Sequence, residues 1–123
     1  SVIGDVYKTQ VYKLAHYLNK EKELIPVHII QKPPSAELRP DQKDSDSLPE
    51  YDVLDAILKD YIEHDKSPME LMKSGYDQDL VRRIIRMIDR SEYKRRQSPP
   101  GIKITPKAFG KDRRMPITNH YLP

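Results

Sequence analysis

Apolar residues recur at helical spacing along three stretches of the chain, and the first stretch runs from Val6 to Leu18. Its apolar positions follow the i, i+3, i+4, i+7 rule, which predicts an amphipathic helix with one apolar face. Asp5 directly precedes this stretch and is expected to cap it, because a carboxylate accepts hydrogen bonds from the free N–H groups of a first turn. The predicted apolar face consists of Val11, Leu14, Ala15 and Leu18.

A second helix is predicted after a long polar segment. Either the sequence Ser47-x-x-Glu50 or Pro49 at the first helical position marks its start. Its apolar positions again lie on one side, with charged residues on the other. The predicted buried residues are Leu54, Ile57, Leu58, Tyr61 and Ile62, and the predicted outward residues are Asp52, Asp55, Lys59, Asp60 and Glu63.

Two further helices are expected close behind. Ser67, Pro68 and Glu70 form a capping box with proline at the first helical position, and Gly75 is expected to end that short helix. Asp77 is the predicted cap of the next helix. Because the connecting turns are short, antiparallel packing is the local expectation. The apolar stripe of this last helix consists of Leu80, Val81, Ile84, Ile85 and Ile88.

The first two helices are separated by an apolar run and a polar loop. Val27 to Ile30 are β-branched except for His28, which predicts a strand or an extended segment. The polar stretch from Gln31 to Asp52 contains Pro33 and Pro34, which keep the backbone extended. Loops of this length in compact domains are typical of lids and binding loops. A solvated linker is the alternative, and periodicity does not decide between them.

The composition suggests that the chain does not bury its apolar faces by itself. Of the 123 residues, 37% are hydrophobic and 33% are charged, which lies below the usual apolar content of a self-sufficient domain. We therefore expect a fragment of a longer polypeptide or an obligate oligomer. No apolar run is long enough for a membrane span, and the absence of cysteine excludes disulfide and thiolate chemistry within the chain. A cytoplasmic location is the expectation.

Charge is distributed unevenly along the chain. Residues 37–79 carry five basic and thirteen acidic residues, a net of −8, whereas residues 80–114 carry twelve and three, a net of +9. This asymmetry suggests pairing of the two halves and a local basic site for an anion. From Ile102 onward the sequence has little periodicity and predicts an irregular basic tail.

A basic ridge is predicted on the polar side of the last helix, where a cation recurs every fourth residue. It is either a solvated, salt-bridging surface or a phosphate-contacting one. Nucleic-acid binding is disfavoured, because Tyr93 and Phe109 are the only aromatic residues nearby and stacking on bases needs more. The ridge consists of Arg82, Arg86, Arg90 and Lys94.

Side chains that often carry catalysis are sparse. The four histidines lack metal-ligand spacing, so a zinc site is not expected, and neither a glycine-rich phosphate loop nor a G-x-S-x-G motif occurs. The carboxylates of the polar loop can hold Mg²⁺ together with phosphate oxygens, although acidic loops are commonly only solvated. The residues by themselves indicate a helical, anion-binding chain that forms part of something larger.

Four motifs together resemble the carboxy-terminal part of glutamine-dependent NAD synthetase. They are GDVYKTQVY, KPPSAELRPDQKDSDSLPEYDVLDAIL, SEYKRRQSPPGIKIT and AFGKDRRMPITN, and they cover nearly the whole chain in order. The resemblance implies that residues 1–123 are a mainly α fragment of an α/β Rossmann-like domain of the adenine nucleotide alpha hydrolase type. It also implies four to five helices, one long polar loop and an irregular basic tail.

The reaction implied by this resemblance is the ATP-dependent amidation of deamido-NAD. Parent enzymes join a glutaminase domain, which supplies ammonia from glutamine, to a synthetase domain of the ATP-pyrophosphatase superfamily. The nicotinate carboxylate is adenylated with loss of pyrophosphate, and ammonia then displaces AMP. ATP and Mg²⁺ are the implied cofactors, with the magnesium ligands expected upstream of this segment. The resemblance further implies a homo-oligomer with no nucleic-acid or membrane partner.

The same resemblance assigns roles to individual residues. Lys8 and Ser35 match the ATP-contacting positions. Tyr93 and Lys94 match the pair that contacts deamido-NAD, with tyrosine standing where many relatives have histidine. The polar loop resembles one that orders over the bound nucleotides. The acidic residues of this lid loop are Glu37, Asp41 and Asp44.

Several family motifs do not occur in these 123 residues. The serine-glycine-glycine pyrophosphate loop, the magnesium-binding acidic residues and the glutaminase Glu-Lys-Cys set are all missing. The chain therefore resembles a truncation, and we predict that it does not make NAD on its own. The alternative hypothesis is a stand-alone helical module that mediates self-association and has no catalytic role.

Overall fold

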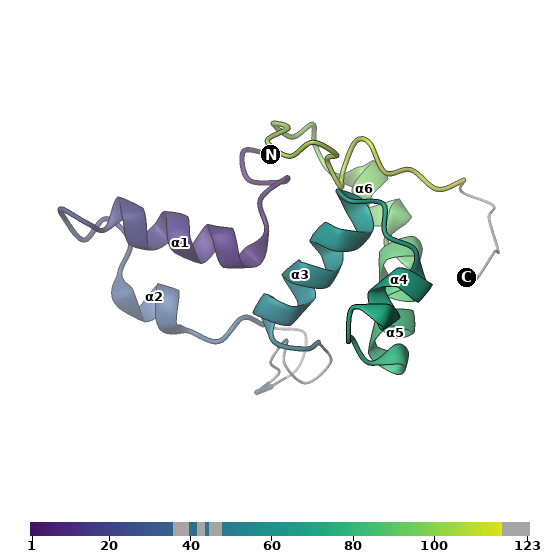
Figure 1. Cartoon of the computed structure of the whole chain (residues 1–123). Helices are drawn as coiled ribbons and strands as arrows, with labels where there is room; N and C mark the ends of the chain where they lie inside the picture. The colour runs from purple at the N-terminus through teal and green to yellow at the C-terminus, as the bar shows by residue number, and fades with distance from the viewer. Residues whose placement is uncertain (36–39, 42–43, 45–47, 117–123) are drawn as a thin grey trace. The chain divides into compact units, whose positions relative to one another are not determined.

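The computed structural model describes residues 1–35, 40–41, 44 and 48–116 of the chain (Figure 1). These residues contain six helices and no strand, where four to five helices were predicted. The chain divides into two compact units, one of residues 7–55 and one of residues 1–6 with residue 56 onward. None of the described helices is long and apolar enough to cross a membrane.

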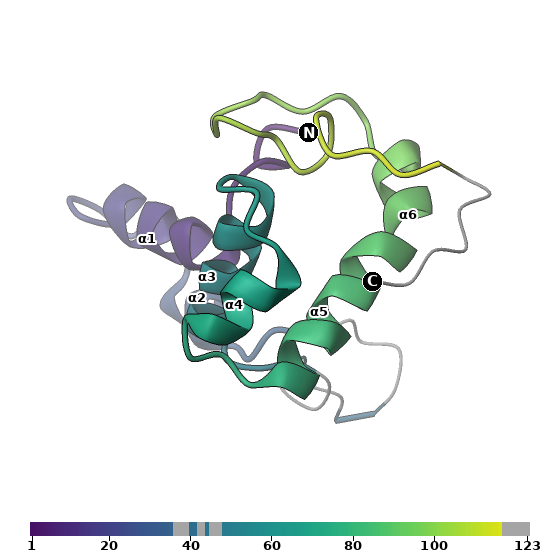
Figure 2. The same ribbon diagram turned by 45° about the vertical axis from the view of Figure 1, so that its right-hand side comes forward.

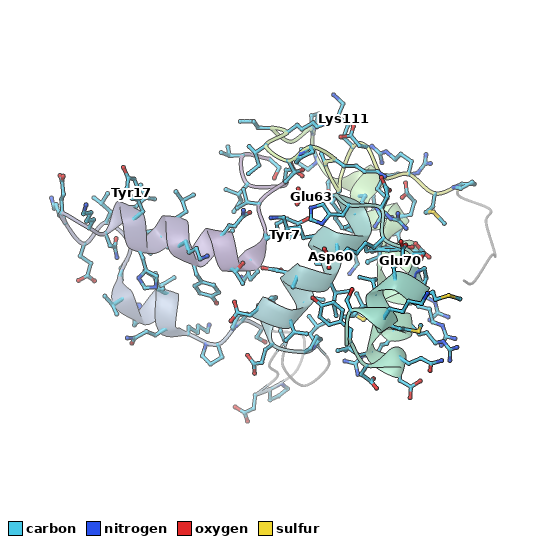
Figure 3. The ribbon with its side chains drawn as sticks, in the orientation of Figure 1. Tyr7, Tyr17, Asp60, Glu63, Glu70 and Lys111 are labelled. Atoms are coloured by element: carbon cyan, nitrogen blue, oxygen red, sulfur yellow. The ribbon has the colours of Figure 1, made fainter. Side chains whose placement is uncertain are left out.

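The unit of residues 7–55 contains α1 (Lys8–Leu18) and α2 (Val27–Gln31). Asn19 closes the turn between them, because its side-chain oxygen accepts from the N–H groups of Leu24 and Ile25 at 3.0 and 2.9 Å. No residue of α1 is buried, and Leu14 and Leu18 on the predicted apolar face are 43% and 45% exposed. Tyr17, labelled in Figure 3, is 71% exposed. The predicted helix is thus confirmed, but within the described residues its apolar face is left partly exposed.

The prediction of a strand at Val27–Ile30 is wrong, because this run begins α2. Glu23 accepts a hydrogen bond from the Val27 N–H at 3.1 Å, and the Ile29 N–H donates to the Pro26 carbonyl at 2.9 Å. β-branched residues favour a strand only where a neighbouring β-strand is available for their side chains to pack against. The described residues offer no such neighbour, and local acceptors satisfy the first N–H groups of a helix instead.

Asp5 does not cap α1, contrary to the prediction. The residue that caps α1 is Tyr7, whose N–H donates to the Gln10 side-chain oxygen at 3.1 Å. Asp5 instead belongs to the other unit, where one carboxylate oxygen accepts from the main-chain N–H groups of Ile104 and Thr105 and from the Thr105 hydroxyl, each at 2.8 Å. The first residues of the chain are thereby tied to its basic tail.

Helix α3 (Tyr51–Ile62) has the predicted apolar face, with Leu54, Ile57 and Ile62 buried. One of its predicted outward residues, Asp55, is buried as well. Its carboxylate accepts from the Thr9 N–H at 2.8 Å, within the unit of residues 7–55. The free N–H groups in the first turn of α1 need acceptors, and a carboxylate from another helix meets that need.

The second unit contains α4 (Pro68–Lys73), α5 (Gln78–Arg90) and α6 (Glu92–Gln97). Helix α4 packs against α5 after a tight turn in which Gly75 has a φ of +96°, a conformation that glycine adopts without strain (Figures 1 and 2). Both predicted caps are confirmed, since Ser67 and Asp77 accept from the N–H groups of Glu70 and Leu80. The apolar core consists of Ile57, Ile62, Leu71, Val81, Ile84, Ile85, Ile88 and Ala108.

The basic ridge does not run along one helix as predicted, because α5 ends at Arg90 and Lys94 lies on α6. Ser91 separates the two helices, and its hydroxyl donates to the Ile88 carbonyl at 2.8 Å. The Arg95 guanidinium donates to that same carbonyl at 2.7 Å. The Ser91 N–H also donates to the Ile88 carbonyl, at 3.1 Å, so this carbonyl at the end of α5 is satisfied by the backbone and by two side chains.

Candidate functional site

Lys8 is the first residue of α1 and its side chain is placed between two aromatic rings. Its ammonium nitrogen lies 5.5 Å from the ring centroid of Tyr12, one turn along the helix, and 5.9 Å from that of Tyr51, the first residue of α3. Both rings offer their electron-rich faces to a cation. Because a helix N-terminus also favours anions, this arrangement presents a positioned positive charge to a negatively charged ligand.

Tyr51 also contacts the polar loop. Its hydroxyl donates to an Asp44 carboxylate oxygen at 2.5 Å. Burial raises the pKa of Tyr51, and the hydrogen bond and negative charge of Asp44 raise it further. The backbone of Asp44 is hydrogen-bonded on both sides, because its N–H donates to the Pro34 carbonyl at 2.9 Å and its carbonyl accepts from the Leu48 N–H at 2.9 Å.

Ser35 follows Pro34 directly and is half-buried in the same unit. The hydrogen bond from Asp44 to Pro34 therefore holds the backbone next to Ser35. Asp41 is exposed and has a φ of +54°. Glu37 lies outside the described residues. Tyr51 thus links Lys8 to Asp44 and, through Pro34, to the segment that carries Ser35.

The second predicted pair, Tyr93 and Lys94, lies on α6 in the other unit. Both residues are exposed, Tyr93 by 57%. The Lys94 carbonyl accepts from the Ser98 hydroxyl at 2.9 Å, which closes the end of α6 before the two prolines. That this pair shares one ligand with Lys8 and Ser35 stays a prediction.

Two residues of this site were missed from the sequence. Tyr12 stands four residues after Lys8, a spacing that places two side chains together on a helix, so the signal was present. Tyr51 lies forty-three residues away from Lys8, and no local sequence pattern predicts the contact between them. Among the described residues, no group of three histidine or acidic side chains could hold a metal ion.

The comparisons with known proteins agree with the resemblance seen in the sequence. The family model for NAD synthase matches residues 1–98. The chain is 53% identical to the glutamine-dependent NAD(+) synthetase of Acinetobacter baylyi over 100% of this chain and 23% of the relative, and 56% identical to that of Aquifex aeolicus over 97% and 21%.

A solved structure agrees as well. The glutamine-dependent NAD+ synthetase of Acinetobacter baumannii, determined with adenosine diphosphate, matches with a TM-score of 0.56 and 44% identity, covering 94% of this chain and 20% of that chain. The chain spans about a fifth of the length of these proteins. On this evidence the chain belongs to the NAD synthase family.

Proposed function

We propose that this chain is the carboxy-terminal part of the ligase domain of a glutamine-dependent NAD synthetase. The reaction would be the amidation of deamido-NAD to NAD through an adenylated intermediate, with release of AMP and pyrophosphate and with ammonia supplied from glutamine. The remainder of the ligase domain, with its Rossmann-like sheet, and the glutaminase domain would belong to the rest of the parent polypeptide. The match to synthetases over 97–100% of this chain supports the proposal.

The observation that carries the proposal is the placement of Lys8 at the start of α1. Its ammonium is held by the Tyr12 and Tyr51 rings, and the solved relative binds ADP. Negative charge builds on pyrophosphate as it leaves, and a cation fixed in advance stabilises that charge without having to reorganise. Ser35, presented by the stiff Pro33–Pro34 segment, would contribute a hydroxyl to the same phosphates.

Tyr93 and Lys94 would contact deamido-NAD. The polar loop with Glu37, Asp41 and Asp44 would close over the nucleotides. An acyl adenylate is prone to hydrolysis, so a loop that excludes water protects the intermediate until ammonia arrives. The hydrogen bond from Tyr51 to Asp44 supports this role, because it anchors the loop beside the residue that also faces Lys8.

Mg²⁺ would accompany ATP in the parent enzyme. Protein-bound Mg²⁺ usually takes one or two carboxylates and completes its shell with phosphate oxygens and water. Asp44 already accepts the Tyr51 hydroxyl, and the described residues form no three-ligand cluster. The proposal therefore assigns the described residues no metal-dependent step.

The proposal is tested in the full-length synthetase with three alanine variants. Lys8→Ala should lower kcat/KM for ATP, and Lys94→Ala should lower kcat/KM for deamido-NAD, each by about 10- to 100-fold, the range expected for a hydrogen bond to a charged group. Lys13→Ala removes an exposed lysine from α1 and serves as the control. If Lys8→Ala and Lys94→Ala leave both constants at the Lys13→Ala level, the proposed sites are wrong.

A second candidate function is self-association, favoured by the exposed apolar residues of the α1–α2 segment. Leu14, Leu24 and Ile29 are 43%, 62% and 56% exposed. A module of this kind would form a homo-oligomer, as expected for a cytoplasmic synthetase too. Sedimentation and an ATP titration distinguish the two functions, because a pure association module should oligomerise and show no response to nucleotide at any concentration.

A further inference from the structure

The buried carboxylate of Glu92 on α6 contacts three arginines, Arg95, Arg96 and Arg114. The Glu92 side chain is 8% exposed, and one of its oxygens accepts from Arg95 Nη2 and Nε at 2.8 and 3.2 Å. The other oxygen accepts from Arg96 Nε at 3.0 Å and lies 3.6 Å from Arg114 Nη1. Burial alone raises the pKa of the Glu92 carboxyl, but hydrogen bonds from Arg95, the Met115 main chain and Arg96 hold it below its ordinary value. The group is therefore anionic at neutral pH.

Arg95 connects this cluster to α5. Its side chain is 5% exposed, and Nη1 donates to both the Ile88 carbonyl and the Ser91 hydroxyl at 2.7 Å. Its guanidinium lies 4.5 Å from the centre of the Phe109 ring. Because these partners surround a planar group with fixed donor directions, Arg95 has one orientation that satisfies them together.

The rotation of α6 about its own axis is restrained where this cluster contacts groups outside the helix, which are the Ile88 carbonyl, the Met115 carbonyl and Arg114. Glu92, Arg95 and Arg96 have the i, i+3, i+4 spacing that places side chains on one face of a helix. Tyr93 and Lys94 fall outside that face, about 100° and about 200° around the helix axis from Glu92, which agrees with their exposure. The directed hydrogen bonds from Arg95 and Arg96 to groups outside α6 favour one rotation of the helix.

Residues of the basic tail also contact the Glu92 cluster. Arg96 Nη2 donates to the Met115 carbonyl at 3.2 Å, and Arg114 reaches the Glu92 carboxylate. Next to them, Arg113 donates to the Tyr61 hydroxyl at 2.7 Å and to Asp89 at 3.3 Å. The tail is thereby held to α3, α5 and α6.

We propose that Glu92 is a positioning residue for deamido-NAD binding, acting through α6 to orient the exposed Tyr93–Lys94 pair. The inference rests on the function proposed above for that pair. Buried ion pairs are weak evidence for stability but are used to fix one arrangement among several. Glu92 has this use here, since it holds Arg95, which donates to Ile88 and lies against the Phe109 ring, and since Arg114 of the tail reaches its carboxylate.

The test uses the full-length synthetase and separates orientation from folding. Glu92→Gln keeps the shape of the side chain but removes the charge that holds the arginines. Glu63→Gln makes the same chemical change directly after α3 in the same unit and is the control (Figure 3). We expect Glu92→Gln to raise KM for deamido-NAD by about fivefold or more, with KM for ATP and kcat within about twofold of the parent. Glu63→Gln should leave all three unchanged.

A purely structural role gives a different pattern. Loss of folded enzyme lowers the apparent kcat and leaves KM for deamido-NAD unchanged, and that result overturns the inference. If Glu92→Gln does not yield folded enzyme, Arg114→Gln decides, because Arg114 is 44% exposed and contributes the longest contact. Arg114→Gln should raise the same KM by a smaller factor, and an unchanged KM overturns the inference.

Lys94→Ala distinguishes this inference from the proposed function. If Lys94→Ala leaves KM for deamido-NAD unchanged, the proposed function of the pair fails and the role of Glu92 fails with it. If Lys94→Ala raises that KM while Glu92→Gln behaves like Glu63→Gln, the proposed function stands and only the positioning role is overturned.

Discussion

Lys8 looks like an ordinary surface cation in the sequence, yet the two tyrosine rings beside it limit where its ammonium can lie. A cation–π contact at an exposed site contributes about 0.5–1 kcal/mol. Ordering a free lysine side chain costs up to roughly 2 kcal/mol of rotamer entropy. Because the two rings already restrict the Lys8 side chain, it loses less rotamer entropy when a phosphate ligand binds. Residue identity gives the charge, and the neighbouring rings give its position.

Tyr51 yields a prediction about pH. Because the Asp44 contact and burial raise the folded-state pKa of Tyr51 above its ordinary value of 10.0, the hydrogen bond contributes its full stability below pH 10.0. That stability is lost only as the pH rises through the higher folded-state pKa. Tyr51→Phe should therefore leave the tyrosinate absorbance that appears around pH 10 unchanged, although the variant has one fewer of the eight tyrosines.

Spectrophotometric titration of the parent chain and the variant measures this directly. A fall in the amplitude around pH 10 would show that Tyr51 ionises in the ordinary range and would contradict the hydrogen bond to Asp44.

At the scale of the helix, the N-terminal caps of α4 and α5 follow from their own sequences, whereas one acceptor in the first turn of α1 comes from another helix. Ser67 and Glu70 cap α4 reciprocally, with Ser67 N–H donating to a Glu70 carboxylate oxygen at 2.8 Å. Asp77 caps α5 at 2.8 Å. In the first turn of α1, the Thr9 N–H donates to Asp55 on α3. A cap formed by residues a few positions apart can be predicted from the sequence, whereas a cap supplied by another element cannot.

The capping box of α4 is expected to have a measurable effect on stability. Ser67→Ala removes the oxygen that accepts from the Glu70 N–H and should lower the free energy of unfolding by about 1 kcal/mol, measured by urea denaturation. Ser74→Ala is the matched control at the other end of α4, where the hydroxyl only donates to the Glu70 carbonyl at 3.0 Å. Equal losses in the two variants would contradict a specific role for the cap.

The same cap predicts a pH dependence. Hydrogen bonds from the Ser67 side chain and main chain lower the pKa of Glu70 below its ordinary 4.5. A carboxylate with a lowered folded-state pKa stabilises the fold above its unfolded pKa, and that stability is lost as the pH falls through the folded-state pKa. The difference between Ser67→Ala and the parent chain should therefore shrink below pH 4.5.

At the scale of the whole molecule, the two units differ in how well they bury their apolar residues. The unit of α4 to α6 has a closed core in which Ile57, Leu71 and Val81 are fully buried. The α1–α2 segment leaves Leu24 and Ile29 more than half exposed and buries none of its helical residues. The chain spans about a fifth of the length of its relatives. The apolar residues are therefore well buried in the unit of α4 to α6, whereas those of the α1–α2 segment remain largely exposed.

The isolated 123-residue chain is predicted to be catalytically inactive. The serine-glycine-glycine pyrophosphate loop of the family does not occur in its sequence, so the leaving group would lack part of its stabilisation. Incubation with ATP, deamido-NAD and ammonia, followed by chromatographic detection of NAD, should give no product above the level without protein. Detectable synthesis would refute the prediction, and the full-length synthetase under the same conditions is the positive control.

The sequence by itself determined the helical character of the chain, the caps of α4 and α5, the apolar stripe of α5 and the family. These features depend on side-chain spacing and on hydrogen bonds between residues a few positions apart. Only the tertiary structure decided that Val27–Ile30 is helical, that Asp5 contacts the tail and that Asp55 is buried. It also decided that Tyr51 faces Lys8 and that Glu92 gathers Arg95, Arg96 and Arg114. Each of these outcomes depends on which distant donor or ring lies close enough to satisfy a polar group, and the spacing of residues along the chain does not contain that distance.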